Sequence, residues 1–245
     1  MEKNLRSTTV ALAVVVALNG GAPSWPPFLP ARDTFPPDLA ASVERVWTDP
    51  TLSRTVQGRP AAVPLDAYIA FVDSPDVTTA AARFLKLARY DVKALGTDWY
   101  EAADGDGSRG IYRVILREPG RRVMLSWGEN RGRILGAIGG SALTVIDLRE
   151  HDGVVDQQLA AYVRIDNAFA AALARLLVPI FGHIADRKLS EGFAVTADVA
   201  EWALAHPDDF CAWLKRAPVP PARREPILQI LPACRADDRV RPPDS

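Results

Sequence analysis

The chain has few of the residues that build metal sites and nucleophilic active sites. Its 245 residues include 2 cysteines and 3 histidines, the histidines at positions 151, 183 and 206. No histidine lies in an H-E-x-x-H spacing, and no G-x-S-x-G nucleophile elbow occurs. We therefore expect no metal, no cofactor and no catalytic residue that the sequence can name.

An excess of charge of one sign is also missing. Lysine and arginine total 29 and aspartate and glutamate total 30, so the formal net charge is -1. No overall field draws the chain to nucleic acid or to an anionic membrane, and we expect no nucleic-acid partner. The 48% of hydrophobic and 24% of charged residues are ordinary for a globular protein with a sizeable core.

The apolar run at residues 10–18 is too short to span a bilayer, which takes about 20 apolar residues. Lys3 and Arg6 precede the run, and small residues up to Ser24 follow it, which is the pattern of a secretory signal. We therefore expect residues 1–24 to be a signal peptide and the protein to be exported, periplasmic or secreted, without stable membrane insertion after processing. The alternative is a short membrane anchor.

Both cysteines lie near the C-terminus. Cys211 and Cys234 make an even count, which in an oxidising compartment favours a disulfide. Such a bridge would join the tail to the last helix and contribute about 3 kcal/mol on the loop-entropy model. The alternative is two free thiols, one of them buried beside Trp213.

The longest helical pattern covers residues 166–192. Its N-cap is Asp166 or Asn167, Pro179 should kink it, and Gly192 stands where a helix ends in the left-handed conformation. A helix this long and apolar needs a large surface to cover it. Its apolar residues fall on one broad face, and they are Phe169, Leu173, Leu176, Leu177, Ile180 and Ile184.

The segments before residue 91 are predicted as follows. Residues 25–37 are too proline-rich for regular structure and form a lead-in. A short helix begins at Asp38, and the alternation of apolar residues at 65–73 predicts a first strand. The sequence Ser74-Pro75-Asp76 begins a second amphipathic helix.

After residue 91 the apolar residues follow a period of two, and short turns separate the runs. This pattern predicts an antiparallel meander. Arg113, Arg117, Arg122 and Arg164 fall on one face, so we expect the sheet to be covered on its other face only. The residues of that other face are Tyr112, Val114, Leu116, Val123, Leu125, Trp127, Leu159, Ala161, Val163 and Ile165.

Two segments fit this meander less simply. The glycine-rich residues 134–142 predict a bulge or a bend in a strand, the alternative being a phosphate loop, which lacks the Lys-Ser/Thr it would need. Beyond Gly192, Thr196 and Pro207 begin two short appended helices within residues 193–216, and residues 217–245 read as a proline-rich, charged tail.

The order helix, strand, helix, meander and long C-terminal helix over residues 38–192 resembles the helix-grip fold of the START-like superfamily, which includes Bet v 1-like (SRPBCC) proteins and polyketide cyclases. The resemblance implies an α+β fold in which a curved antiparallel sheet wraps around the C-terminal helix and encloses a cavity for a lipid, a sterol or another apolar molecule. The two short helices after residue 192 depart from the usual ending of that fold.

On this expectation, side chains from strands and helix line a cavity. Large aromatic residues at inward strand positions are also common in plain cores. His183 and Arg187 fall in the same arc as the apolar helix residues, where Arg187 would hold an anionic head group; otherwise both lie on a solvated helix end. The predicted ligand-binding residues are Trp99, Tyr112, Val114, Leu125, Trp127, Phe169, Leu173, Leu176, Ile180, His183 and Arg187, with Tyr100 as a further aromatic candidate.

The sequence leaves three functions open. The first is an exported, monomeric protein that binds or carries a lipid-like small molecule in the cavity. The second is a cyclase- or hydrolase-type enzyme on the same fold, with His183 or Tyr112 as the proton-transfer group. The third is an interaction module without a cavity. We expect the first, a binding protein rather than an enzyme.

Overall fold

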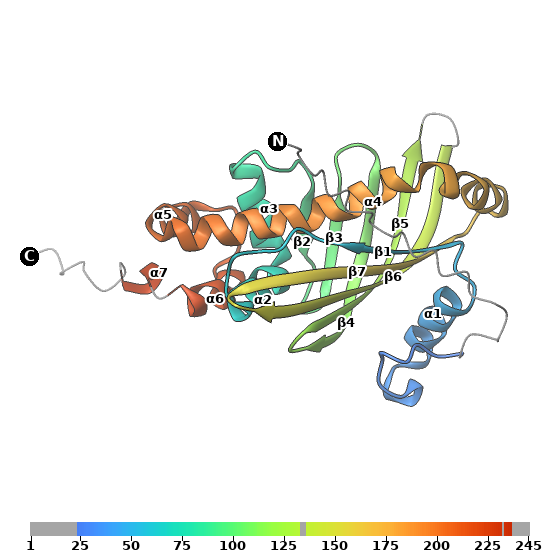
Figure 1. Cartoon of the computed structure of the whole chain (residues 1–245), viewed down its shortest axis with the longest axis horizontal. Helices are drawn as coiled ribbons and strands as arrows, with labels where there is room; N and C mark the ends of the chain where they lie inside the picture. Colours follow the sequence, from blue (N-terminus) through green and yellow to red (C-terminus); the bar gives the residue numbers. More distant parts are fainter. Residues whose placement is uncertain (1–23, 133–135, 232, 237–245) are drawn as a thin grey trace, which may run out of the picture.

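The structure is a computed structural model that describes residues 24–132, 136–231 and 233–236. At residues 131, 132, 136, 169, 170, 173–189, 235 and 236 it describes the backbone alone. Within the described residues the chain forms one antiparallel sheet of seven strands, with helices against both of its faces (Figure 1).

The sheet is a meander of strands β2 to β7, and the early strand β1 is added at its β7 edge. Its strand order is β1-β7-β6-β5-β4-β3-β2, and every pair is antiparallel. Turns such as the one at Gly153, which has a positive φ of 74°, join consecutive long strands. The strands are β1 (Leu52–Gln57), β2 (Asp91–Ala94), β3 (Trp99–Ala103), β4 (Ser108–Glu118), β5 (Arg121–Gly132), β6 (Gly136–His151) and β7 (Val154–Ile165).

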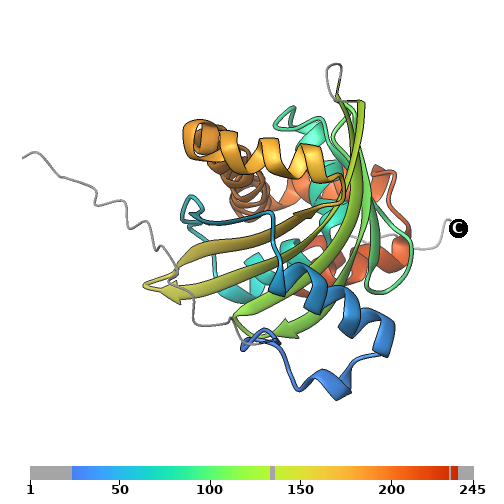
Figure 2. The ribbon, with the colours of Figure 1, turned by 90° about the vertical axis from the view of Figure 1, so that its right-hand side faces the viewer.

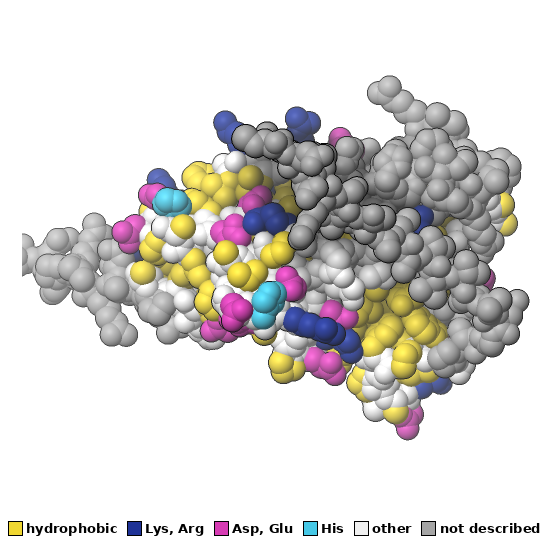
Figure 3. Space-filling view, viewed as in Figure 1, with side chains coloured by type: hydrophobic (Ala, Val, Ile, Leu, Met, Phe, Trp, Pro, Cys, Tyr) yellow, Lys and Arg dark blue, Asp and Glu magenta, His cyan; other side chains and the backbone are white. Residues whose placement is uncertain are grey.

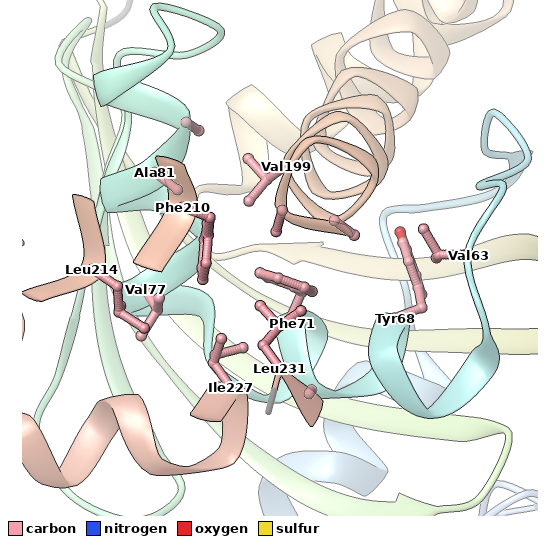
Figure 4. Packing of buried hydrophobic residues seen from close by; sticks show 14 of the residues in the cluster. Val63, Tyr68, Phe71, Val77, Ala81, Val199, Phe210, Leu214, Ile227 and Leu231 are labelled. Atoms are coloured by element: carbon pink, nitrogen blue, oxygen red, sulfur yellow. The ribbon is translucent and has the colours of Figure 1, made fainter. Parts of the chain in front are cut away.

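The concave face of the sheet carries most of the helices. These are α2 (Leu65–Asp73), α3 (Pro75–Phe84), α4 (Ala168–Ala205), α5 (Pro207–Arg216), α6 (Pro221–Ile230) and α7 (Ala233–Ala236). They pack together over one end of the sheet, where Phe71, Val77, Val199, Phe210 and Ile227 form the main core (Figure 4). This is the α+β helix-grip architecture that the sequence predicts.

Helix α4 continues past the end that the sequence predicts. It runs without a break through Gly192 to Ala205, so the first expected appended helix is its last part. The first part of α4 runs across the long axis of the molecule and the remainder runs along it (Figures 1 and 2). Pro179 lies in the first half of α4, and a proline inside a helix removes one backbone hydrogen bond and kinks it.

The convex face is covered as well, which corrects the expectation of a sheet covered on one side only. The short 3-10 helix η1 (Arg32–Thr34) and α1 (Pro37–Thr48) lie against this face (Figure 2). Leu29 of the lead-in and Val43 and Val46 of α1 pack on Leu125 and Leu143 of the sheet. The proline-rich lead-in is therefore part of the core on this side.

Three segments differ from the predicted elements. Residues 65–73 form helix α2 instead of a strand. The apolar residues at 65, 67, 69 and 71 alternate, but the residues that are buried, Ala67, Tyr68, Ala70 and Phe71, have helical spacing. Strand β1 was not predicted, since its residues LSRTVQ are mostly polar at an edge of the sheet. The expected tail contains α6, whose Ile227 is fully buried.

The disulfide is confirmed. Cys211 on α5 and Cys234 on α7 are bonded, with their Cα atoms 5.0 Å apart, and both are buried in the main core. The bridge holds the C-terminal helices against α5, and hence against the end of α4.

Replacing Gly192 by alanine tests the course of α4. The glycine has no positive φ, and an added Cβ would meet no atom within 4 Å. Gly192→Ala should therefore stabilise the protein by up to about 1 kcal/mol, the helix-propensity difference between the two residues. Denaturant unfolding measures this; a loss of stability would indicate a left-handed helix end at this position.

Removing the disulfide should destabilise the fold. The bridge closes a loop with a sequence separation of 23, for which loop entropy gives about 3 kcal/mol. In urea unfolding, the double variant Cys211→Ala/Cys234→Ala should have a lower midpoint than the oxidised protein. A reductant should shift the wild type to the midpoint of the variant and leave the variant unchanged; equal midpoints throughout would contradict the account.

Candidate functional site

A hollow lies on the concave face of the sheet, beside the main core. Its inner pocket, of about 380 Å³, lies between α2, α3, the Gly192 to Thr196 part of α4 and the middle of the sheet. Its outer pocket, of about 520 Å³, lies over β3 to β7. The two pockets share Tyr90, Tyr112 and Ser126, so they form one site in the volume range of small-molecule pockets.

The floor of the outer pocket is made of residues with little or no side chain. Gly110, Gly128 and Gly140 stand next to one another on β4, β5 and β6. A Cβ at Gly110 would lie 2.5 Å from the carbonyl oxygen of Trp127, and one at Gly140 would lie 2.6 Å from that of Arg164. Only glycine permits so close an approach of neighbouring strands, and the same absence of side chains leaves room above them.

The middle of the floor is apolar and partly accessible. Met124, Ala142, Thr144 and Ile146 border the hollow and are half-buried, whereas their sequence neighbours Val123, Leu143 and Val145 on the convex face are buried under α1. At these positions the convex face of the sheet is therefore more deeply buried than the concave face, which is the face toward α4.

Two tyrosines supply the polar groups at the junction of the pockets. The hydroxyls of Tyr90 and Tyr112 make no hydrogen bond with any residue that the structure describes, although both residues line the inner and the outer pocket. Tyr68, in the inner pocket, instead bonds through its hydroxyl to the side chain of Gln157. Tyr90 and Tyr112 thus leave two phenol groups for a bound molecule.

Burial extends the pH range over which these phenols stay neutral. Desolvation raises the pKa of Tyr90 to about 12. Desolvation also raises the pKa of Tyr112, and the nearby Tyr100 and Asp76 raise it further. A neutral phenol can donate one hydrogen bond and accept others, so each group suits a carbonyl, hydroxyl or ether oxygen.

Buried ion pairs fix the helices that form the wall of the inner pocket. Asp73, the last residue of α2, accepts two hydrogen bonds of 2.7 Å from the buried guanidinium of Arg122 on β5. Asp76 on α3 accepts bonds of 2.9 and 3.0 Å from Arg223 on α6, which also donates to the Tyr100 hydroxyl over 3.1 Å. Removing one partner from such a pair leaves a buried charge uncompensated, so α2 and α3 are held firmly over the sheet.

The structure separates the strand residues predicted to share one cavity wall. Tyr112 lines the hollow, and Val114 lies on the same face of β4 but does not border it. Leu125 faces the other way into the core under α1. The ring of Trp127 stacks on that of Trp99, with ring centroids 5.8 Å apart, although Trp127 also borders the outer pocket beside Gly128.

A β-bulge explains this separation. The pairing of β4 with β5 shifts between Val114 and Leu116, so the alternation of faces reverses there. Leu116 therefore shares a face with Leu125, whereas Tyr112 pairs with Ser126 on the opposite one. A sequence pattern that counts straight through the bulge assigns Tyr112 and Leu125 to the same face.

The predicted helix residues of the site lie outside the described side chains. The backbone at these positions belongs to α4, and whether the residues line the hollow stays a prediction. They are Phe169, Leu173, Leu176, Ile180, His183 and Arg187.

Several residues of the hollow were not anticipated. Tyr90 stands between α3 and β2, where the sequence gives no inward or outward pattern, and Ser126, Ala142 and Thr144 are too small or polar to stand out. Phe193 follows Gly192, at which the sequence predicts the end of the helix, yet it borders the inner pocket. In the sequence, the floor of the hollow could have been recognised only from small residues at corresponding positions of neighbouring strands, such as Gly110, Gly128 and Gly140.

The structure shows no metal-binding group and no membrane span among the described residues. In that part of the chain no cluster of three or more His, Cys, Asp or Glu side chains is placed to hold a metal ion. No helix there is both long enough and apolar enough to cross a bilayer.

Comparison with known proteins gives matches in structure only. No protein-family model and no curated protein matches the chain. Similar solved structures include a conserved protein from Geobacillus kaustophilus (18% identity, TM-score 0.43, covering 62% of this chain and 93% of that one). They also include Ara h 8.0201 (8%, 0.41, 63% and 100%) and truncated norcoclaurine synthase from Thalictrum flavum (12%, 0.38, 63% and 95%).

All three TM-scores are below 0.5, so nothing about this chain is concluded from these matches. The chain has a helix-grip fold because its own antiparallel sheet curves around a long C-terminal helix. The assignment rests on that topology.

An alkaline titration tests the burial of the tyrosines. In the folded protein Tyr90 should ionise near pH 12, and Tyr68 and Tyr112 should also ionise above the ordinary value of 10.0. In the unfolded chain these phenols ionise near pH 10. Because their pKa values are higher in the folded protein, the free energy of unfolding falls as the pH rises from about 10 toward 12.

Ultraviolet absorbance of tyrosinate measures this ionisation. The Tyr90→Phe variant should lose the step near pH 12 and keep the others. Full ionisation of the folded protein near pH 10 would show that the tyrosines are in water and that the hollow is not a low-polarity site.

Proposed function

We propose that the protein binds an apolar or amphipathic small molecule in the hollow. The observation that carries the proposal is the accessible apolar stretch of the concave face, bounded by α2, α3 and α4. Covering exposed apolar surface gains about 25 cal/mol for each Å² removed from water, so a molecule that fills the hollow is bound mainly by the hydrophobic effect. A lipid-like compound has the required shape and polarity.

The two free phenols favour a ligand that bears oxygen. Tyr90 and Tyr112 stand where the pockets join, so a chain or ring system that spans both pockets brings a carbonyl or hydroxyl oxygen past them. A hydrogen bond there contributes about 0.5–1.5 kcal/mol and fixes orientation more than affinity. At neutral pH both groups are protonated phenols and act as neutral donors, and their raised pKa values extend this state to higher pH.

We further propose that the protein is an exported carrier that works as a monomer. The Cys211–Cys234 disulfide supports export, because disulfides persist in oxidising compartments. The signal-like pattern at residues 1–24 supports it independently of the fold. A carrier function requires that the molecule be taken up and released again, which agrees with a hollow that is bounded by helices but not sealed within the core.

Filling the hollow tests the binding. Ala142 lines the outer pocket, and Ala142→Phe places a ring where the ligand would lie. A neutral naphthylamine probe that fluoresces in apolar surroundings should bind the wild type and bind the variant at least tenfold more weakly. Glu101→Phe is the matched control, since it adds the same ring at an exposed position of β3 outside the hollow. No binding by the wild type, or equal binding by both variants, would contradict the proposal.

Removing the phenols tests the polar contact. Tyr112→Phe and Tyr90→Phe should each weaken binding of a long-chain methyl ketone about fivefold, as expected for one lost hydrogen bond of ~1 kcal/mol. Binding of the alkane of equal length should stay unchanged. Displacement of the same probe reports both affinities; a parallel loss for ketone and alkane would assign the tyrosines a packing role only.

A further inference from the structure

The turn between α3 and β2 exposes an unusual group of side chains. Residues 83–90, here called the cationic turn, have the sequence RFLKLARY. Phe84 is 54% exposed and Leu87 is 41% exposed, and both are among the few large hydrophobic residues that the described part of the chain leaves in water. Scattered exposed leucines are ordinary, but two such residues in one turn, with Lys86 between them and an arginine on either side, require an explanation.

The backbone holds this turn in a strained form. Lys86 has a positive φ of 60°, a conformation that glycine adopts readily and lysine rarely. The amide of Lys86 donates to the carbonyl of Arg83 over 3.1 Å and that of Leu87 to Ala82 over 2.8 Å, which closes the end of α3. A lysine at a position suited to glycine places a cation beside Leu87.

The apolar part of the turn has a rigid support. The ring of Phe84 lies against Trp202 at the end of α4 and Trp213 on α5, with ring centroids 6.0 and 5.9 Å apart. Trp213 in turn contacts Phe210, next to the disulfide-bonded Cys211. Phe84 is thus held at the surface by a fixed aromatic cluster, with more than half of it in water.

The charge of the cationic turn has one sign. Arg83, Lys86 and Arg89 are cations, and residues 77–90 contain no acidic residue. Arg83 is paired with Asp91, whereas Lys86 and Arg89 are exposed and have no ion pair among the described residues. This local excess exists although the chain as a whole is nearly neutral. In Figure 3, dark blue side chains project above the hydrophobic surface near α3, and magenta side chains lie on the same face toward α5.

The same turn leads directly into the hollow. Its last residue, Tyr90, lines both pockets, and the four exposed residues of the turn lie within six positions of it in the sequence. A surface that holds the turn therefore lies beside the binding site.

We propose that the cationic turn docks on an anionic lipid bilayer, with Phe84 and Leu87 in the interface and Lys86 and Arg89 against the head groups. Aromatic and aliphatic residues flanked by lysine and arginine are the composition of membrane-surface segments. Charge complementarity selects an anionic bilayer over a neutral one. Docking of this kind goes beyond ligand binding in the hollow, and it brings that site to the place where lipid-like molecules are stored.

Vesicle flotation of the full chain tests the docking. The wild type should float with vesicles of phosphatidylcholine and phosphatidylglycerol in equal parts, and not with phosphatidylcholine alone. Each lysine or arginine near an anionic surface raises affinity about fivefold. The variant Lys86→Gln/Arg89→Gln should therefore bind about 25-fold more weakly, and salt should weaken wild-type binding.

Two controls assign any binding to this turn. Phe84→Ser/Leu87→Ser should also lose flotation, whereas Leu95→Ser, which removes a more exposed leucine from another loop, should not. Sedimentation without vesicles tests whether the patch joins two copies of the chain; concentration-dependent dimers lost in Phe84→Ser/Leu87→Ser would overturn the proposal. So would an absence of wild-type flotation, or equal flotation of all variants.

The outcome is independent of the ligand. Lys86→Gln/Arg89→Gln should bind the naphthylamine probe as the wild type does, because neither residue lines the hollow. Probe binding without flotation would remove the membrane proposal and leave the ligand-binding proposal standing, and flotation without probe binding would do the reverse.

Discussion

The close approach of neighbouring strand backbones at Gly110, Gly128 and Gly140 is the constraint on which the site depends. Side chains at these positions would collide with carbonyl oxygens of the next strand, so the strands approach one another there only because Cβ atoms are missing. The three glycines therefore have two effects. They permit the close spacing of the strands, and they leave the floor of the outer pocket without side chains.

The helices complete the site by filling one end of the concave face, and the hollow lies beside this packed end. The clusters of Phe71, Phe210 and Ile227 anchor α2, α5 and α6, and the Asp73–Arg122 pair fixes the end of α2 to the sheet. The last part of α4 belongs to this packed end. Its bend turns the first part of the helix across the molecule, away from the course that a straight helix along the sheet would follow.

The general fold followed from the sequence because the meander and the long helix have strong periodic patterns. The disulfide followed from the number and placement of the cysteines. The details of the site did not, since the bulge after Val114 reverses which residues face inward, and periodicity alone does not reveal a bulge. Helix α2 was mistaken for a strand because a nine-residue apolar segment fits both periods. Tyr90 was missed because it lies in a turn, where no period applies.

We propose a binding protein with a low-polarity hollow and two neutral hydrogen-bond donors, Tyr90 and Tyr112. The most direct test of this claim is native mass spectrometry of the full-length protein purified without detergent, followed by solvent extraction. The account predicts a discrete additional mass that dissociates on activation and extracts as an apolar or amphipathic compound. A protein that has only its own mass, and keeps it after incubation with a lipid extract, would contradict the account.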